Sequence, residues 1–181
     1  MNSSSCTSLT DILRQEARTT YAITEKLFHH VNDTELMWTP SAGENWMTVG
    51  QLMMHCAQFG CGLAVRGFIR GEWDQPEPMT VSGPETNIHI PPAAMMPAVK
   101  SVAEALDRLA ADSRLTLACL ADIEDSRLLS GTIPAPWGGP DLCLFQHLYR
   151  MIAHLSQHKG QLFYYLKLMG KNVSTEDLWG K

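Results

Sequence analysis

Two histidines lie four residues apart near the end of the chain, at His154 and His158. Four residues make about one helical turn, so their imidazoles share one face of a helix and can hold one metal ion between them. A third histidine, His55, lies about a hundred residues earlier. The spacing alone is a weak signal, because a chain with seven histidines contains such pairs by chance. Such histidines can also line a wet groove or bond to core carbonyls.

Placement strengthens the metal interpretation. His158 takes an apolar position in the hydrophobic stripe of the last predicted helix, and His55 does the same in the second. A buried imidazole without a partner costs a few kcal/mol, so two such intrusions are best explained if the side chains converge. No Glu follows His154 as in the H-E-x-x-H motif, so a zinc protease of that type is not indicated.

Four segments have the apolar periodicity of amphipathic helices, and they span about residues 8–30, 48–71, 98–123 and 141–169. The second begins with the best signal, since Thr48 and Gln51 form a capping box. Gly71 and Gly170 are typical helix ends. We therefore expect an all-α fold, a four-helix bundle that forms a single domain over residues 1–181.

The connection between the second and third helices is unusually long. It covers about 26 residues, 72–97, whereas bundle neighbours are usually joined by about 2–8. A connection of this length can cross the bundle from end to end and leave helices 2 and 3 parallel. The last helix then runs antiparallel to the second. His55 lies about 10 Å from the start of its helix and His158 about 18 Å from the end of its own, so this arrangement brings them towards one level.

Composition narrows the partners and the compartment. The net charge is −5 and no run of Lys or Arg occurs, so nucleic acid is not expected as a partner. No apolar run of about 18 residues predicts a membrane span. Residues 1–6 lack the basic and apolar regions of a secretory signal. The five cysteines are an odd number without a C-x-x-C pair, which favours the reducing cytoplasm. A small molecule is therefore the expected partner.

Two further residues have both a structural and a chemical interpretation. His147 lies on nearly the same helix face as His154, so it is either an outer metal ligand or, by our preference, a surface or boundary residue. Cys56 points about 100° away from His55 on a helix and is interpreted as a small core residue rather than a nucleophile.

Other polar and aromatic residues are expected around the site. Gln161 follows His158 by three residues and could orient it or a bound water, with a bond to another helix as the alternative. Tyr165 is interpreted as a packing residue whose hydroxyl could reach the cleft. Trp38 and Trp46 are expected to cover the bundle end near the site.

Three segments together resemble one known family. They are residues 38–40 (WTP), 44–55 (ENWMTVGQLMMH) and 154–162 (HLSQHKGQL). These segments resemble the DinB/YfiT superfamily, and the H-x-x-x-H-[KR]-G-Q ending is the most specific part. The likeness extends over essentially the whole chain. It implies a four-helix bundle with a crossover between helices 2 and 3, and homodimers in many members.

The resemblance also implies a chemistry. It implies a divalent metal, nickel or zinc above others, held by three histidines that correspond here to His55, His154 and His158. Characterised relatives include transferases that use the low-molecular-weight thiols bacillithiol or mycothiol, and a mycothiol-dependent isomerase. Three neutral imidazoles leave an ion with open positions for water or a thiolate, and the ion lowers the pKa of either. Imidazole ligands alone do not select the metal.

The sequence leaves three hypotheses. The first is a metal-dependent thiol transferase or hydrolase that acts on a small electrophile. The second is a non-catalytic metal-binding protein with a stress or interaction role. The third is a helical bundle whose histidines bind no metal. Metal content separates the third hypothesis from the others, and turnover with a thiol separates the first from the second.

Overall fold

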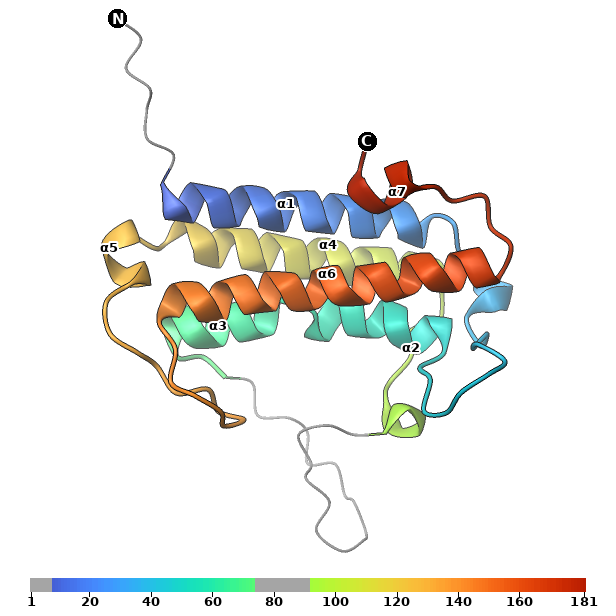
Figure 1. The fold of residues 1–181 in the computed structure, drawn as a ribbon, viewed down its shortest axis with the longest axis horizontal. Coiled ribbons are helices and arrows are strands. Elements are labelled where there is room, and N and C mark those ends of the chain that lie inside the picture. Colours follow the sequence, from blue (N-terminus) through green and yellow to red (C-terminus); the bar gives the residue numbers. More distant parts are fainter. Residues whose placement is uncertain (1–7, 74–91) are drawn as a thin grey trace, which may run out of the picture.

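The fold is all-α, as expected from the sequence. The computed structural model describes residues 8–73 and 92–181, which are helical apart from loops and one isolated antiparallel bridge between Ile133 and Leu142 (Figure 1). Most of the expected crossover connection, residues 74–91, lies outside the described residues. The course of that connection therefore stays a prediction.

Three long helices and one broken helix run side by side (Figure 1). The long ones are α1 (Leu9–Phe28), α4 (Val102–Ala121) and α6 (Leu144–Leu168). The broken one consists of α2 (Val49–Met54), the π-helical turn η2 (His55–Phe59) and α3 (Gly62–Arg70). The short elements are η1 (Asp33–Glu35), η3 (Ala93–Met95), α5 (Asp125–Leu128) and α7 (Thr175–Trp179). Both α1 and α3 contact both α4 and α6, so each has two long neighbours.

Side-chain caps determine where the helices begin. Thr48 accepts a hydrogen bond from the backbone N–H of Gln51, whose side chain accepts one from the N–H of Thr48, which confirms the predicted capping box. The third helix begins at 102 rather than 98, because Ser101 is its cap. The fourth begins at 144 rather than 141, because Leu142 is extended and pairs with Ile133.

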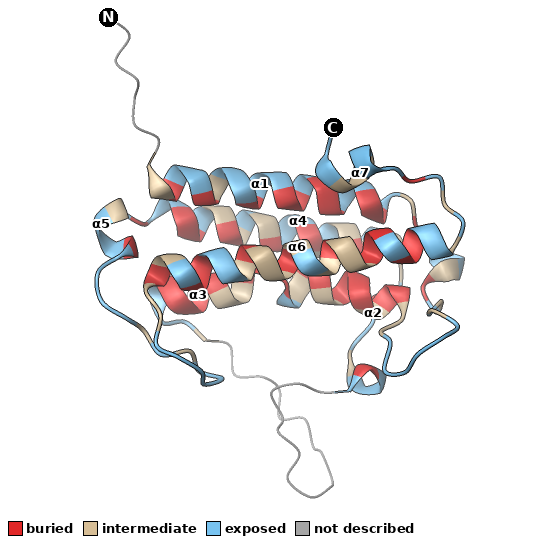
Figure 2. Cartoon of the chain, in the orientation of Figure 1, coloured by how far each residue is buried: buried red, intermediate tan, exposed pale blue. Residues whose placement is uncertain are grey.

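The inner faces of these helices form one apolar core (Figure 2). Fully buried leucines contribute from every long helix, and they include Leu13, Leu27, Leu52, Leu120, Leu148, Leu155 and Leu162. Each buried side chain of this kind contributes roughly 1.5–3 kcal/mol relative to an exposed one. Among the described residues, the stretch Val49–Arg70 is long and apolar enough to cross a membrane, but most of it is buried in this core, as in the core helix of a soluble protein.

Candidate metal centre

The second helix is broken at Gly60 and Cys61, so the prediction of one continuous helix over 48–71 is wrong there. The π-helical turn η2 ends at Phe59, and Cys61 then has φ −151° and ψ −55°, outside the helical region. A π-turn and a break interrupt the i→i−4 hydrogen bonds and leave backbone groups without helical partners. Two of these groups find partners on neighbouring helices. The carbonyl of Gly60 bonds to His154 of α6, and the N–H of Gly62 bonds to Asp112 of α4.

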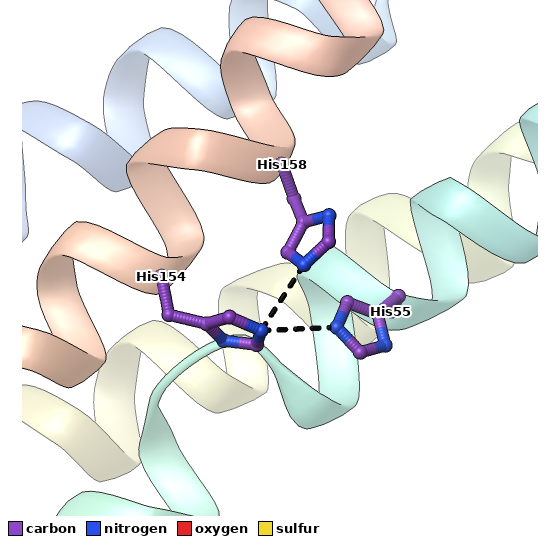
Figure 3. A group of neighbouring side chains, drawn as sticks. All are labelled: His55, His154 and His158. Carbon is purple, nitrogen blue, oxygen red and sulfur yellow. Dashed lines mark hydrogen bonds between the residues drawn. The ribbon is translucent and has the colours of Figure 1, made fainter. Parts of the chain in front are cut away.

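The three predicted histidines converge across the gap between η2 and α6 (Figure 3). The Nε2 atom of His154 lies 3.2 Å from Nε2 of His55 and 3.1 Å from Nε2 of His158. All three rings are half-buried, and one ligand atom from each lies within 4.8 Å of the others. The sequence prediction that these side chains meet is confirmed.

The ring of His154 is oriented by the break. Its Nδ1 lies 3.0 Å from the carbonyl oxygen of Gly60. A carbonyl can only accept, so Nδ1 carries the hydrogen and donates it. In the neutral imidazole the other nitrogen, Nε2, then has a lone pair, and that atom faces the other two histidines.

The ring of His158 is oriented by a chain of side chains on its own helix. Its Nδ1 donates to Oε1 of Gln161 at 3.1 Å, and Nε2 of that amide donates to the Tyr165 hydroxyl at 3.1 Å. The hydroxyl donates in turn to the carbonyl of Met47 at 3.1 Å. Gln161 therefore orients a predicted ligand, as proposed from its spacing, and Tyr165 anchors Gln161 to the residue before the capped start of α2. The Nε2 of His158 is left with a lone pair.

His55 is the least constrained of the three. Within the described part of the chain its Nδ1 is buried without a hydrogen-bond partner. Burial, with the nearby rings of His158 and His154, lowers the pKa of His55 to about 3. Burial and the His154 ring also lower the pKa of His158. Both rings are therefore neutral near pH 7, which is the form that binds a metal.

The donor set fits a divalent ion. In these tautomers the lone pairs of His154 and His158 face each other at 3.1 Å, and two neutral rings repel each other there unless a proton or a metal ion lies between them. Metal–nitrogen bonds of about 2.0–2.1 Å place neighbouring ligand nitrogens about 3.4 Å apart in tetrahedral geometry and about 3.0 Å apart in octahedral geometry. The observed separations of 3.1 and 3.2 Å lie between these values. Three such ligands leave open coordination positions.

His147 does not join the three clustered histidines, and its interpretation as a surface or boundary residue is wrong. The side chain is only 2% exposed. Its Nε2 is 2.8 Å from the carbonyl oxygen of Ile133, and its ring stacks on Phe68 with a centroid separation of 4.0 Å. The bridge between Ile133 and Leu142 brings this carbonyl to the start of α6. His147 thus fastens the preceding loop to α6.

The cysteines beside the site are core residues, as predicted for Cys56. Cys56 and Cys61 are both buried. Burial raises the pKa of each thiol to about 12. Neither is a thiolate near pH 7, so neither is a ready nucleophile.

A second buried polar cluster, which sequence reasoning missed, lies on the α4 side of the break. The Tyr21 hydroxyl donates to Asp112 at 2.6 Å and lies 2.8 Å from the hydroxyl of Thr116. Asp112 also accepts from the N–H of Gly62 at 3.1 Å. Burial raises the pKa of Asp112 to about 6, against the lowering effect of these hydrogen bonds. The sequence does carry a signal for this cluster. The spacing of Leu109, Asp112, Thr116 and Cys119 continues the core stripe of the helix through two polar residues.

Comparison with models of protein families tests the resemblance that the sequence motifs suggested. The model of the DinB superfamily matches residues 16–162. The chain belongs to the DinB superfamily. Comparisons with curated proteins and with solved structures give no match. The DinB match contains all three histidines and Gln161, whereas Tyr165 and α7 lie beyond it.

Proposed function

We propose that this DinB protein is an enzyme whose divalent metal, nickel or zinc, is held by Nε2 of His55, His154 and His158. The observation that carries the proposal is the pair of facing lone pairs on His154 and His158, each oriented by a hydrogen bond at Nδ1. We propose a thiol transferase or hydrolase that acts on a small electrophile. When bound, the ion acts as a Lewis acid and lowers the pKa of a coordinated water or thiol.

Residues of the chain orient the histidine rings, but none of the described residues beside the site supplies the nucleophile. The Gly60 carbonyl and the Gln161 amide hold two rings in the tautomer that binds metal. The thiols of Cys56 and Cys61 are protonated near pH 7 because burial raises their pKa to about 12. A low-molecular-weight thiol or water therefore supplies the attacking atom in this proposal.

The wider setting belongs to the same proposal. The side-by-side packing of α1, α4, α6 and the broken helix (Figure 1) supports a four-helix bundle with a crossover over residues 72–97, formed as one domain over 1–181. We propose a cytoplasmic protein whose partner is a small-molecule substrate or thiol, rather than nucleic acid or a membrane, and which forms a homodimer.

Metal content is the first test. The full chain, purified without a histidine tag, is expected to contain about one equivalent of divalent metal by elemental analysis. His158→Ala is expected to lose that metal. The control His29→Ala changes an exposed histidine and is expected to retain it. Less than about a tenth of an equivalent in the wild type, unchanged in His158→Ala, would show that the three histidines hold no metal.

Turnover is the second test. Metal-loaded protein is mixed with each of a panel of low-molecular-weight thiols and with monochlorobimane, which becomes fluorescent when its chloride is displaced by sulfur. Metal-dependent turnover with one thiol is expected. A fully metal-loaded protein that turns over no thiol and hydrolyses no small electrophile would instead be the non-catalytic metal-binding protein of the second hypothesis.

A further inference from the structure

A cavity of about 470 Å³ lies between the loop before α2 and the C-terminal half of α6. This volume is within the usual range for small-molecule sites, roughly 300–1,000 Å³. The residues that line it are Trp38, Pro40, Ser41, Ala42, Trp46, Gln161, Tyr164, Tyr165 and Leu168. The cavity is thus formed by two segments that are distant in the sequence.

The cavity and the proposed metal ligands share one stripe of α6. His154, His158, Gln161, Tyr165 and Leu168 follow one another at alternating steps of four and three residues, so they lie on one face of the helix. At 1.5 Å per residue, Gln161 is about 4.5 Å and Leu168 about 15 Å along the axis from His158. Gln161 lines the cavity and accepts the hydrogen bond of His158. One end of a molecule in the cavity therefore lies about one helical turn from a metal ligand.

The walls of the cavity are aromatic and are held in place. The ring of Trp38 meets that of Tyr165 at 66° with centroids 5.3 Å apart, and Trp46 meets the same ring at 75° and 6.1 Å. The indole N–H of Trp46 donates to the carbonyl of Ala42 at 2.7 Å, which fixes the orientation of that ring. Rings arranged in this way offer faces and edges to another planar ring.

The lining carries no charge. None of the described residues that form it is Lys, Arg, His, Asp or Glu. A charged group placed there would lose hydration without gaining a counter-ion. One donor is available at the end near the metal centre, because the Gln161 amide has two hydrogens and gives one to Tyr165.

We propose that this cavity binds the uncharged aromatic part of the substrate, with a hydrogen-bond acceptor of that substrate facing Gln161. The inference rests on the proposed function, because it makes the small electrophile an aromatic one, such as an aryl ketone with a leaving group beside the carbonyl. When the leaving group is chloride, the thiolate sulfur forms a bond to the carbon beside the carbonyl. The bond between that carbon and chlorine breaks, and chloride leaves. The thiol proton passes to solvent.

Binding is tested with acetophenone, which has an aromatic ring and a carbonyl acceptor but no leaving group. NMR titration of the full chain is expected to show tighter binding of acetophenone than of cyclohexyl methyl ketone, by about fivefold, because only the former has a π system for edge-to-face contacts. Benzenesulfonate is expected to bind more weakly than acetophenone because of its charge. An equal affinity for all three ligands would overturn the proposal.

Three variants locate the binding site. Trp46→Ala and Tyr164→Ala remove exposed walls of the cavity and are each expected to weaken acetophenone binding about tenfold. The matched control is Tyr149→Ala, an equally exposed tyrosine on α6 outside the cavity, and it is expected to bind like the wild type. If Trp46→Ala and Tyr164→Ala bind like Tyr149→Ala, the cavity is not the site. If a second copy of the chain already covers it, acetophenone fails to bind and Trp46→Ala dissociates the dimer, which also overturns the proposal.

Two α-chloroketones separate this inference from the proposed function. Phenacyl chloride and chloroacetone carry the same reactive group and differ in a phenyl or a methyl. Tyr164→Ala is expected to lower kcat/KM about tenfold for phenacyl chloride and to leave chloroacetone unchanged. His55→Ala, which removes a proposed ligand outside the cavity, is expected to retain acetophenone binding and lose turnover. Acetophenone binding that meets these expectations in a protein without metal or turnover supports the cavity and contradicts the proposed function alone.

Discussion

Two polar clusters, one buried and one half-buried, flank the break in the second helix, and they differ in whether their polar atoms find partners. In the cluster on the α4 side, the carboxylate of Asp112 accepts from the Tyr21 hydroxyl and from the N–H of Gly62. The Tyr21 hydroxyl also lies within hydrogen-bond distance of Thr116. This cluster is complete as it stands, as buried polar groups in proteins usually are.

In the cluster on the α6 side, lone pairs face one another. His154 and His158 are each bonded at Nδ1, yet their Nε2 lone pairs face each other at 3.1 Å. His55 adds a third nitrogen and leaves its own Nδ1 buried without a partner. The hydrogen bonds at Nδ1 orient the rings of His154 and His158 so that their lone pairs point towards a position where the three histidines could hold a metal ion.

The difference separates a structural role from a functional one. The same break supplies a carbonyl to one cluster and an N–H to the other. A cluster whose groups are all satisfied stabilises the fold, so changing it is expected to cost stability. A cluster with converging lone pairs is organised for a ligand, so changing it is expected to cost binding. The predictions below test this separation, from the largest expected effect to the smallest.

Asp112→Ala is expected to destabilise the metal-free protein by about 3 kcal/mol, because the Tyr21 hydroxyl and the Gly62 N–H lose their acceptor in a buried site. Urea denaturation after treatment with EDTA measures this change. Asp107→Ala removes an exposed aspartate from the same helix and is expected to stay within about 0.5 kcal/mol of the wild type. Equal stability of the two variants would contradict a structural role for the α4-side cluster.

Two glycine-to-alanine substitutions compare the break with the uninterrupted helix α6. A Cβ at Gly62 would overlap the carboxylate of Asp112, whereas one at Gly160 meets no heavy atom within 4 Å. Gly62→Ala is therefore expected to destabilise the protein by about 2 kcal/mol. Gly160→Ala is expected to stabilise it by roughly 0.5–1 kcal/mol, since alanine favours the helix. Thermal unfolding of both variants checks the sign, and a shift in the same direction for both would contradict the prediction.

The sequence predicted the convergence of the histidines because helical periodicity is a local property. His55 and His158 occupy apolar positions in their stripes, so antiparallel packing of those stripes against each other brings the two rings towards one level. Placing His154 required only the four-residue spacing on one helix. The helix faces and the convergence of the three histidines could therefore be predicted from the sequence alone.

The break and its partners were not accessible, because tertiary contacts decide them. Gly60 and Gly62 each weaken a helix by only about 1 kcal/mol, which does not predict that the helix breaks between them. The break is held open by Asp112 and His154 from other helices. The burial of His147 depends likewise on the carbonyl of Ile133, which the bridge to Leu142 brings near. A charged residue such as Asp112 is rarely buried, and only its partners reveal why this one is.

Gln161→Ala tests the hydrogen bond that orients His158. Its loss frees the imidazole to rotate and to change tautomer, so metal affinity is expected to fall about 10–100-fold while the free energy of unfolding of the metal-free protein changes little. Competition with a chelator at fixed pH measures the affinity. The control Gln157→Ala changes an exposed glutamine on the same helix. Gln161 has no part in orienting the ligand if both variants bind metal equally.

The pH dependence of stability distinguishes the clusters by sign. Burial lowers the pKa of His55 to about 3 in the folded protein, whereas the unfolded value is about 6.5. The unfolded chain therefore binds the extra proton as pH falls below 6.5, and acid removes stability. Burial raises the pKa of Asp112 to about 6, above an unfolded value of about 3.9. The folded chain binds this proton first, so acid adds stability until the pH falls below the unfolded pKa.

Between pH 7 and pH 5 the two contributions oppose each other, and each is on the order of 1–2 kcal/mol. The lowered pKa of His158 adds to the contribution of His55, so the metal-free wild type is expected to lose about 1 kcal/mol on acidification. Asp112→Asn keeps the shape of the side chain without its titration, so its stability is expected to fall more steeply than that of the wild type. The stability of His55→Ala is expected to fall less steeply than that of the wild type. Urea midpoints at pH 7 and pH 5 test both expectations. If stability falls equally for Asp112→Asn and the wild type, the carboxylate of Asp112 stays ionised at both pH values, held by the hydrogen bonds from Tyr21 and Gly62.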